Sequence, residues 1–277
     1  MNTINCNGTL VNLNKTKVMG IINVTPDSFY DGGNTIKEAD ILKQAGQMLE
    51  EGATFLDVGG YSSRPDASDI SVDEEINRVV PAIAVILKHY PHTFVSIDTF
   101  RSAVAKKAVQ AGACMVNDIS GGNLDPKMHR TVAQLKVPYV LMHMRGTPQT
   151  MKKLTDYSDV TFEVIQYFSR QLALAREAGI NDVVIDPGFG FAKTRQQSFE
   201  LLRYMELLKQ LDVPILAGVS RKSMVYKTLK ISAKEALNGT TVLHTVALQK
   251  GASILRVHDV KEAMQCIKLV EMLSPYP

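Results

Sequence analysis

The chain has 277 residues, of which 45% are hydrophobic and 21% are charged, and 31 Lys and Arg against 28 Asp and Glu give a net charge of +3. This composition excludes a disordered or collagen-like chain, and the small, scattered positive excess argues against a nucleic-acid binder. No apolar run reaches the roughly 18 residues of a membrane helix, and the polar segment 1–17 differs from a signal peptide. We therefore expect a soluble cytoplasmic protein. Cys6, Cys114 and Cys266 match no metal spacing, which favours reduced structural thiols.

The first predicted element is a β-hairpin over residues 3–13. Asn7-Gly8 lies at its centre, and this dipeptide is a strong signal for a two-residue hairpin turn. We expect this hairpin to close the N-terminal mouth of the barrel that the rest of the chain predicts.

Eight short apolar runs follow, each bounded by polar residues or Gly. Their apolar character on both faces is typical of strands in a parallel sheet. Apolar residues at helical spacing, as in 36–49 and 260–270, predict amphipathic helices between them. The predicted strands are 18–22, 54–58, 94–97, 114–116, 139–142, 183–185, 215–217 and 254–257.

A glycine recurs at the junctions between a predicted helix and the next strand. Gly52, Gly112, Gly179 and Gly251 occupy this position, where a helix commonly ends in a residue of positive φ. The repeat of about 30 residues predicts an α/β fold, a (β/α)8 TIM barrel, as one domain over residues 1–277. A doubly wound open sheet is the alternative, but neither of the usual phosphate-binding patterns, GxGxxG and GxxxxGK[ST], occurs.

Polar residues stand where the predicted strands end, which is where a barrel of this kind collects its functional groups. Any single Asp or Asn there could merely cap a turn. Charged Lys222 and Arg256 cannot accept those bonds, and neither can His258 when protonated, so we predict a polar site at this mouth. The set comprises Asn23, Asp57, Asp98, Asn117, His143, Asp186, Lys222, Arg256 and His258.

Two loops, 23–33 and 59–66, exceed the usual length of a βα connection. Loops of this length are often lids or binding loops, and a merely solvated loop is the alternative. We expect mobile segments around Thr25, Asp27, Asp31 and Arg64.

The motifs of the chain resemble those of the dihydropteroate synthase family, a group of folate-pathway enzymes that sulfonamide drugs inhibit. They follow the family order from the first strand to the last. The motifs are residues 19–29 (MGIINVTPDSF) with 31–33 (DGG), 57–60 (DVGG) with 63–65 (SRP), 96–99 (SIDT), 117–121 (NDISG), 186–191 (DPGFGF), 218–223 (GVSRKS) and 256–259 (RVHD). The resemblance implies a (β/α)8 barrel that uses Mg²⁺ to make 7,8-dihydropteroate and diphosphate from 6-hydroxymethyl-7,8-dihydropterin diphosphate and 4-aminobenzoate.

The resemblance also implies the residues that bind the pterin and its diphosphate. Asp186 would accept two hydrogen bonds from one edge of the pterin, Asn117 would offer a donor and an acceptor, and Lys222 a donor. Asn23 would bind Mg²⁺ through its side-chain oxygen. The implied binding set is Asn23, Ser63, Asp98, Asn117, Asp186, Lys222, Arg256 and His258, and the implied catalytic set is Asn23, Asp98, Lys222, Arg256 and His258.

The 4-aminobenzoate ring needs an apolar slot with a polar end. The implied set here is Phe29, Ser63, Pro65, Phe191, Lys222 and Ser223. Ser63 stands where the family often has Thr, and Tyr61 stands where Glu or Gln is frequent. Asp66 occupies the position after Arg-Pro, where the family usually has Gly. These departures concern the second loop, because the residues assigned to the pterin match the family throughout.

Two other functions remain open from the sequence. A barrel that binds pterin or methylated folate for a corrinoid partner would share the pterin carboxylate and Asn, but it would not need the diphosphate residues. An inactive or regulatory relative is the other possibility. By resemblance we expect a homodimer, with small-molecule substrates and neither nucleic acid nor membrane as partner. His143 and Arg145 stay unassigned as solvated loop residues.

Overall fold

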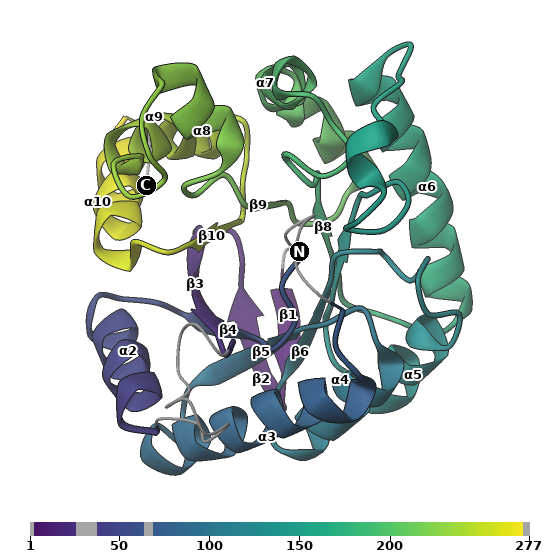
Figure 1. Cartoon of the computed structure of the whole chain (residues 1–277), viewed down its shortest axis with the longest axis vertical. Helices are drawn as coiled ribbons and strands as arrows, with labels where there is room; N and C mark the ends of the chain where they lie inside the picture. The colour runs from purple at the N-terminus through teal and green to yellow at the C-terminus, as the bar shows by residue number, and fades with distance from the viewer. Residues whose placement is uncertain (1–2, 26–37, 64–68, 274–277) are drawn as a thin grey trace.

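The computed structural model describes residues 3–25, 38–63 and 69–273. Eight parallel strands form a ring in the order β8-β7-β6-β5-β4-β3-β10-β9 (Figure 1). A bridge between Ile185 and Ile215 joins the two ends of that order and closes the barrel. The strands are β3 (Lys17–Asn23), β4 (Phe55–Gly59), β5 (Phe94–Asp98), β6 (Met115–Asp118), β7 (Tyr139–Met142), β8 (Val183–Asp186), β9 (Leu216–Ala217) and β10 (Ile254–Val257). The predicted (β/α)8 barrel is confirmed, and each predicted strand is found with its ends within two residues.

Helices cover the outside of this ring (Figure 1). Capping explains where several of them begin: Thr194 and Gln197 form a capping box at the start of α7, and Ser71 accepts a bond from the Glu74 N–H at the start of α3. None of the described helices is long and apolar enough to span a bilayer. The helices are α2 (Glu38–Glu50), α3 (Val72–His89), α4 (Ser102–Gln110), α5 (Met128–Leu135), η1 (Met151–Lys153), α6 (Val160–Glu177), α7 (Arg195–Arg203), η2 (Met205–Leu211), α8 (Ser223–Leu229), α9 (Leu237–Gln249) and α10 (Val260–Glu271).

The predicted junction glycines have the backbone conformation expected of them. Gly52, Gly112, Gly179 and Gly251 have φ between 92° and 111°, a region in which a side chain would be strained. Each of these glycines therefore ends a helix and turns the chain into the next strand, as the sequence predicts.

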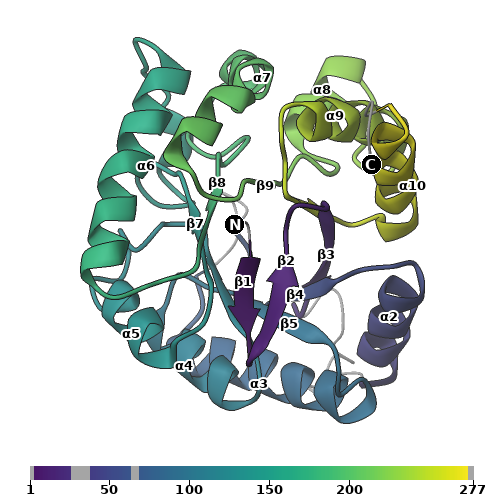
Figure 2. The same ribbon diagram turned by 180° about the vertical axis from the view of Figure 1, so that it is seen from behind.

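The N-terminal hairpin consists of β1 (Thr3–Cys6) and β2 (Thr9–Asn12), joined by Asn7 and Gly8, which both have positive φ. Seen from behind, it lies across the barrel opening (Figure 2). Its apolar side chains, among them Ile4 and Val11, pack in one buried cluster with the first inward-facing residues of the strands, such as Phe55 and Met115. The predicted N-terminal hairpin is confirmed, and its apolar side chains pack at one end of the barrel interior.

Side chains alternate along each strand, and this alternation carries polar groups into the barrel. On β4, Phe55 belongs to the buried cluster at the hairpin end, so Asp57 and Gly59 also face inward, one and two layers higher. The larger apolar cluster, which includes Val58 and Ile97, packs between the strands and the helices. The interior is thus apolar at the hairpin end and polar toward the C-terminal ends of the strands.

Candidate active site

The centre of the polar mouth is the guanidinium group of Arg256 on β10. Its Nε donates to Oδ2 of Asp57 at 2.6 Å, and its Nη2 donates to Oδ2 of Asp98 at 2.7 Å. Asp57 is fully buried, and Asn117 also donates to its Oδ2, from Nδ2 at 2.8 Å. The structure thus brings together four polar residues from four strands, as their positions at the strand ends predict.

Burial and charge act against each other in this cluster. Burial raises the pKa of Asp98 to about 7, although the neighbouring positive charge of Arg256 favours its ionised form. Burial alone would lower the pKa of Arg256, but the charges of Asp57 and Asp98 outweigh it and raise that pKa. Arg256 is therefore a fixed positive charge, whereas Asp98 can change its protonation state near neutral pH.

A third carboxylate, Asp186 at the end of β8, faces the mouth beside Lys222. Its Oδ1 accepts the Gly188 N–H at 2.8 Å. A Cβ atom at Gly218 would lie 3.7 Å from both Oδ2 of Asp186 and Nζ of Lys222, so the missing side chain leaves room between these two groups. Burial raises the pKa of Asp186, and Lys222 opposes that rise. Oδ2 is therefore placed to accept hydrogen bonds from a ligand.

Lys222 connects this carboxylate to the loop that follows β8. Its Nζ donates to the Phe189 carbonyl at 2.7 Å and lies 4.8 Å from the centre of the Phe191 ring. Burial lowers the pKa of Lys222 to about 8, against the charge of Asp186. Ser223 comes next in the chain, as the first residue of α8. Lys222, Ser223 and Phe191 therefore form a second part of the site, with an apolar ring and polar groups.

His258 follows β10, and its orientation is fixed by Ser220. The Ser220 hydroxyl oxygen accepts the backbone N–H of His258 at 3.1 Å and lies 3.0 Å from Nδ1 of the ring. With its oxygen engaged in this way, the hydroxyl can donate its hydrogen to Nδ1, which leaves the proton of a neutral ring on Nε2. The His258 side chain is partly exposed, yet protein atoms displace much of the water around it. This desolvation and the charge of Arg256 lower the pKa of His258 to about 4.

Asn23 is the last residue of β3 and pairs in register with Gly59 of β4. Its side chain is exposed, unlike the rest of that strand. Ser63 and Thr25, which were predicted in the two loops, are half-buried. The other predicted loop residues, Phe29, Pro65, Asp27, Asp31 and Arg64, lie outside the described residues, and so does Asp66.

The expectation that His143 is a solvated residue is wrong. Its ring is buried, with Nδ1 at 2.7 Å from Nζ of Lys193, and its edge packs against Tyr167. Lys193 also donates to the carbonyls of Gly188 and Phe191, each at 3.1 Å. Burial lowers the pKa of Lys193 well below its usual value. Lys193 thus ties the loop after β8 to the end of β7, a role that the sequence does not predict because nothing in its local sequence indicates burial.

Arg221 also has a structural task that its position in the turn before Lys222 does not predict. It has φ of 50°, and its guanidinium pairs with both oxygens of Asp259 at 2.8 Å. Its backbone N–H donates to the Thr240 hydroxyl at 3.0 Å. These contacts hold the strained turn that directs Lys222 toward Asp186, and Asp259 neutralises the charge of the Arg221 guanidinium.

Arg145, the other residue left unassigned, pairs with Glu163, and its guanidinium carbon lies 3.7 Å from the centre of the Tyr157 ring. Tyr61, one of the departures in the second loop, stacks edge to face on Phe100 with ring centres 5.0 Å apart. These contacts hold the segments that follow β7 and β4 at the rim of the mouth.

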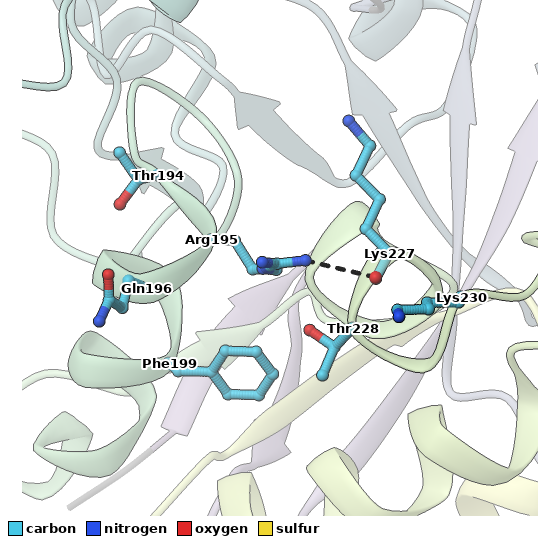
Figure 3. A pocket seen from close by; sticks show the side chains of 7 residues that line it. All are labelled: Thr194, Arg195, Gln196, Phe199, Lys227, Thr228 and Lys230. Atoms are coloured by element: carbon cyan, nitrogen blue, oxygen red, sulfur yellow. Dashed lines mark hydrogen bonds between the residues drawn. The ribbon is translucent and has the colours of Figure 1, made fainter.

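An open groove of about 670 Å³ lies outside the barrel, between α7 and α8 (Figure 3). Arg195 lies in this groove and donates to the Lys227 carbonyl at 3.3 Å (Figure 3), and Phe199 also lines the groove. The groove contains none of the carboxylates found at the mouth, so the convergent polar groups that chemistry requires belong to the mouth.

The sequence matches the model of the pterin binding enzyme family over residues 19–258. It is 45% identical to the dihydropteroate synthase of Synechocystis over 94% of this chain and 90% of the relative. The fold agrees with that of a Xanthomonas albilineans dihydropteroate synthase solved with 4-aminobenzoic acid, with a TM-score of 0.91, 38% identity and coverage of 99% of both chains. A structure of the enzyme from the same organism with 7,8-dihydropteroate gives a TM-score of 0.88 and 36% identity, covering 99% of this chain and 100% of the other.

Proposed function

Since the chain belongs to the pterin binding enzymes and, within them, to the dihydropteroate synthases, we propose how the mouth of its barrel performs the synthase reaction. The protein condenses 6-hydroxymethyl-7,8-dihydropterin diphosphate with 4-aminobenzoate to give 7,8-dihydropteroate and diphosphate. The observation that carries the assignment of residues is the buried Asp186 carboxylate, which lies beside Lys222 at one mouth with the Arg256 cluster.

The pterin is bound by hydrogen bonds that match its edges. Asp186 accepts from the 2-amino group and the neighbouring ring N–H, a pairing in which an ionised acceptor makes the bonds stronger. Asn117 and Asp98 meet the remaining ring atoms, and the Lys222 ammonium donates to a ring nitrogen or carbonyl. Because these groups converge from β5, β6, β8 and the loop after β9, the barrel holds the planar ring in one orientation.

The diphosphate is held at the side of the mouth where Arg256 and His258 lie. Asp57 and Asp98 already engage Nε and one hydrogen of Nη2 of Arg256, so the two hydrogens of Nη1 and the second hydrogen of Nη2 can donate to phosphate oxygens. His258 donates from Nε2, because Ser220 occupies Nδ1. Ser63 completes this set. Donors and charge aimed at the leaving group stabilise it as it departs.

The bond from the pterin methylene carbon to the diphosphate breaks through a loosely bonded, cation-like transition state, and diphosphate leaves with the bonding electrons. The amine nitrogen of 4-aminobenzoate forms the new bond to that carbon and releases one proton. Water must be excluded from that carbon, and loops closing over the mouth would do so. Thr25 belongs to one of these loops, and the predicted roles of Asp27, Asp31 and Arg64 concern residues outside the described part.

The 4-aminobenzoate ring is placed against Phe191, with its carboxylate near the Ser223 hydroxyl. Lys222 lies over the Phe191 ring and so borders both substrates. Ser63 borders the same slot, and Phe29 and Pro65 remain predictions for residues that the structure does not describe.

Asn23 would hold Mg²⁺ at the mouth, where the ion would neutralise charge on the leaving diphosphate. The donor set fits a weakly held hard cation: one exposed amide oxygen, with no cluster of three His, Cys, Asp or Glu in residues 3–25, 38–63 and 69–273. Mg²⁺ usually keeps several waters and takes oxygens from substrate phosphates. We therefore expect measurable Mg²⁺ binding only with diphosphate present. Calorimetric titration with and without diphosphate checks this, and equal Mg²⁺ affinity in both would contradict it.

The purified protein with Mg²⁺ is expected to release diphosphate only when both substrates are present. A coupled diphosphate assay with each substrate omitted in turn measures this, and the product is identified by mass. Diphosphate released equally without 4-aminobenzoate would sink the synthase assignment. Pterin binding with no diphosphate release would favour a pterin-binding barrel that serves a corrinoid partner.

We further propose that the chain forms one domain over residues 1–277, works in the cytoplasm and assembles as a homodimer. Its three cysteines are free and buried, which suits a reducing compartment. Apolar side chains such as Leu229, Val242 and Leu269 are exposed on the outer helices and suit a contact between copies. Light scattering after gel filtration is expected to give twice the chain mass of 30.5 kDa, and a monomer at micromolar concentration would refute the dimer.

A further inference from the structure

Asp57 has no assigned role in binding either substrate, yet it joins two residues that do. It lies in the middle inward-facing layer of β4 and is fully buried. A single oxygen, Oδ2, accepts from Nε of Arg256 on β10 at 2.6 Å and from Nδ2 of Asn117 on β6 at 2.8 Å. One carboxylate therefore connects opposite parts of the barrel wall beneath the mouth.

The contact also determines which atom Asn117 can offer to a substrate. An ionised carboxylate only accepts hydrogen bonds, so the Asn117 nitrogen must face Asp57. The Asn117 oxygen is consequently turned away from Asp57 and can accept a bond from a ligand N–H. In the same way, the bond to Nε of Arg256 orients the guanidinium plane.

We propose that Asp57 is a positioning residue that sets the pterin specificity of the site by fixing the amide orientation of Asn117 and the plane of Arg256. This inference rests on the proposed function of the mouth. Loss of Asp57 should therefore affect binding of the pterin diphosphate and not of 4-aminobenzoate. Phe191 and Ser223, on the 4-aminobenzoate side, belong to the loop after β8 and to α8, and Asp57 forms no hydrogen bond with either segment.

Asp57→Leu tests the proposal directly. Leu has nearly the same shape as Asp but no acceptor atom, so Asn117 and Arg256 both lose the hydrogen bond that orients them. We expect KM for the pterin diphosphate to rise about 10- to 100-fold, as for loss of a hydrogen bond to a charged group, with KM for 4-aminobenzoate changed less than about twofold. Steady-state kinetics with each substrate varied separately measure this split.

Ser96 provides a matched control. It is the residue of β5 that pairs in register with Asp57, it is equally buried, and its hydroxyl has no hydrogen-bond partner among the described residues. Ser96→Ala should leave both KM values unchanged. Equal effects of the two variants on pterin KM would mean that any polar change in this layer disturbs binding, and would overturn the specific role of Asp57.

A second variant, Asp57→Asn, keeps one acceptor oxygen. That oxygen can take the place of Oδ2 and accept from both Asn117 and Arg256, while the NH₂ group takes the place of Oδ1, for which no hydrogen-bond partner is found among the described residues. We expect Asp57→Asn to bind the pterin at least about tenfold more tightly than Asp57→Leu, measured by calorimetry with the pterin alone. Equal pterin affinity of the two variants when both are folded, or an unchanged pterin affinity in Asp57→Leu, would overturn the proposal. Because calorimetry requires no turnover, failure of the synthase assay is distinguishable from failure of this inference.

Discussion

Asp186→Asn is expected to weaken pterin binding about 100-fold or more, with KM for 4-aminobenzoate much less affected. The carboxylate is buried and has one oxygen, Oδ2, facing the gap beside Gly218, where two pterin donors would meet it. The substitution puts an NH₂ group against those donors, so that buried polar groups lose their partners as well as a charged acceptor. Isothermal calorimetry with the pterin alone measures the loss.

Asp212→Asn is the matched control, because Asp212 is exposed and lies before β9, at the end of the barrel away from the mouth. Thermal melting of both variants separates binding from folding. If Asp186→Asn binds the pterin as tightly as Asp212→Asn does, Asp186 is not the pterin acceptor and the orientation proposed for the ring is wrong.

The fold could be predicted from local patterns because each element of the barrel has its own signal. Apolar runs of strand length alternate with helical stripes, and Gly52 and the three equivalent glycines punctuate them at the positions where φ is positive. Asn7-Gly8 predicts the hairpin turn for the same local reason. None of these inferences requires knowledge of which distant residues touch.

The site could be predicted only in part. Which residues lie in it follows from their positions at the ends of strands, but the contacts among them depend on the tertiary structure. Their positions at or just after the ends of strands were enough to predict that Asp98, Asp186 and Lys222 lie at one mouth of the barrel. It could not show that Arg221 would be taken by Asp259, 38 residues away, or that His143 would be buried against Lys193, 50 residues away. Long-range pairing of this kind has no local sequence signal.

The lack of a local signal for long-range contacts also explains why the sequence places Asp57 in the predicted polar site but assigns it no role. Its partners are separated from it by 60 and 199 residues, and both donate to one oxygen. A cap at a strand end and a carboxylate buried inside the barrel have the same local sequence. Only the closed barrel distinguishes them, because it places β10 and β6 within reach of β4.

Arg256→Met is expected to abolish measurable synthase activity and to destabilise the fold by about 3–5 kcal/mol near pH 8, the range for removing one partner of a buried ion pair. Asp57 and Asp98 would lose their shared cation, and Asp57 has no exposed surface through which water could replace it. Urea denaturation at pH 5 and pH 8 measures the stability, and diphosphate release measures the activity.

The stability loss should depend on pH in a defined direction. A carboxyl whose pKa is higher in the folded than in the unfolded chain binds more protons when folded, so the free energy of unfolding falls as pH rises between the two pKa values. Burial already raises the pKa of Asp98 from 3.8 to about 7, and removal of Arg256 raises it further. The difference between variant and wild type should therefore be largest above pH 7 and should shrink toward pH 5.

Arg130→Met controls for the loss of one positive charge, because Arg130 is exposed on α5. It should leave activity and stability close to the wild type at both pH values. A destabilisation by Arg256→Met that is equal at pH 5 and pH 8 would show that lost packing, and not the two carboxylates, accounts for it. In that case the ion pairs with Asp57 and Asp98 would not explain how Arg256 stabilises the fold.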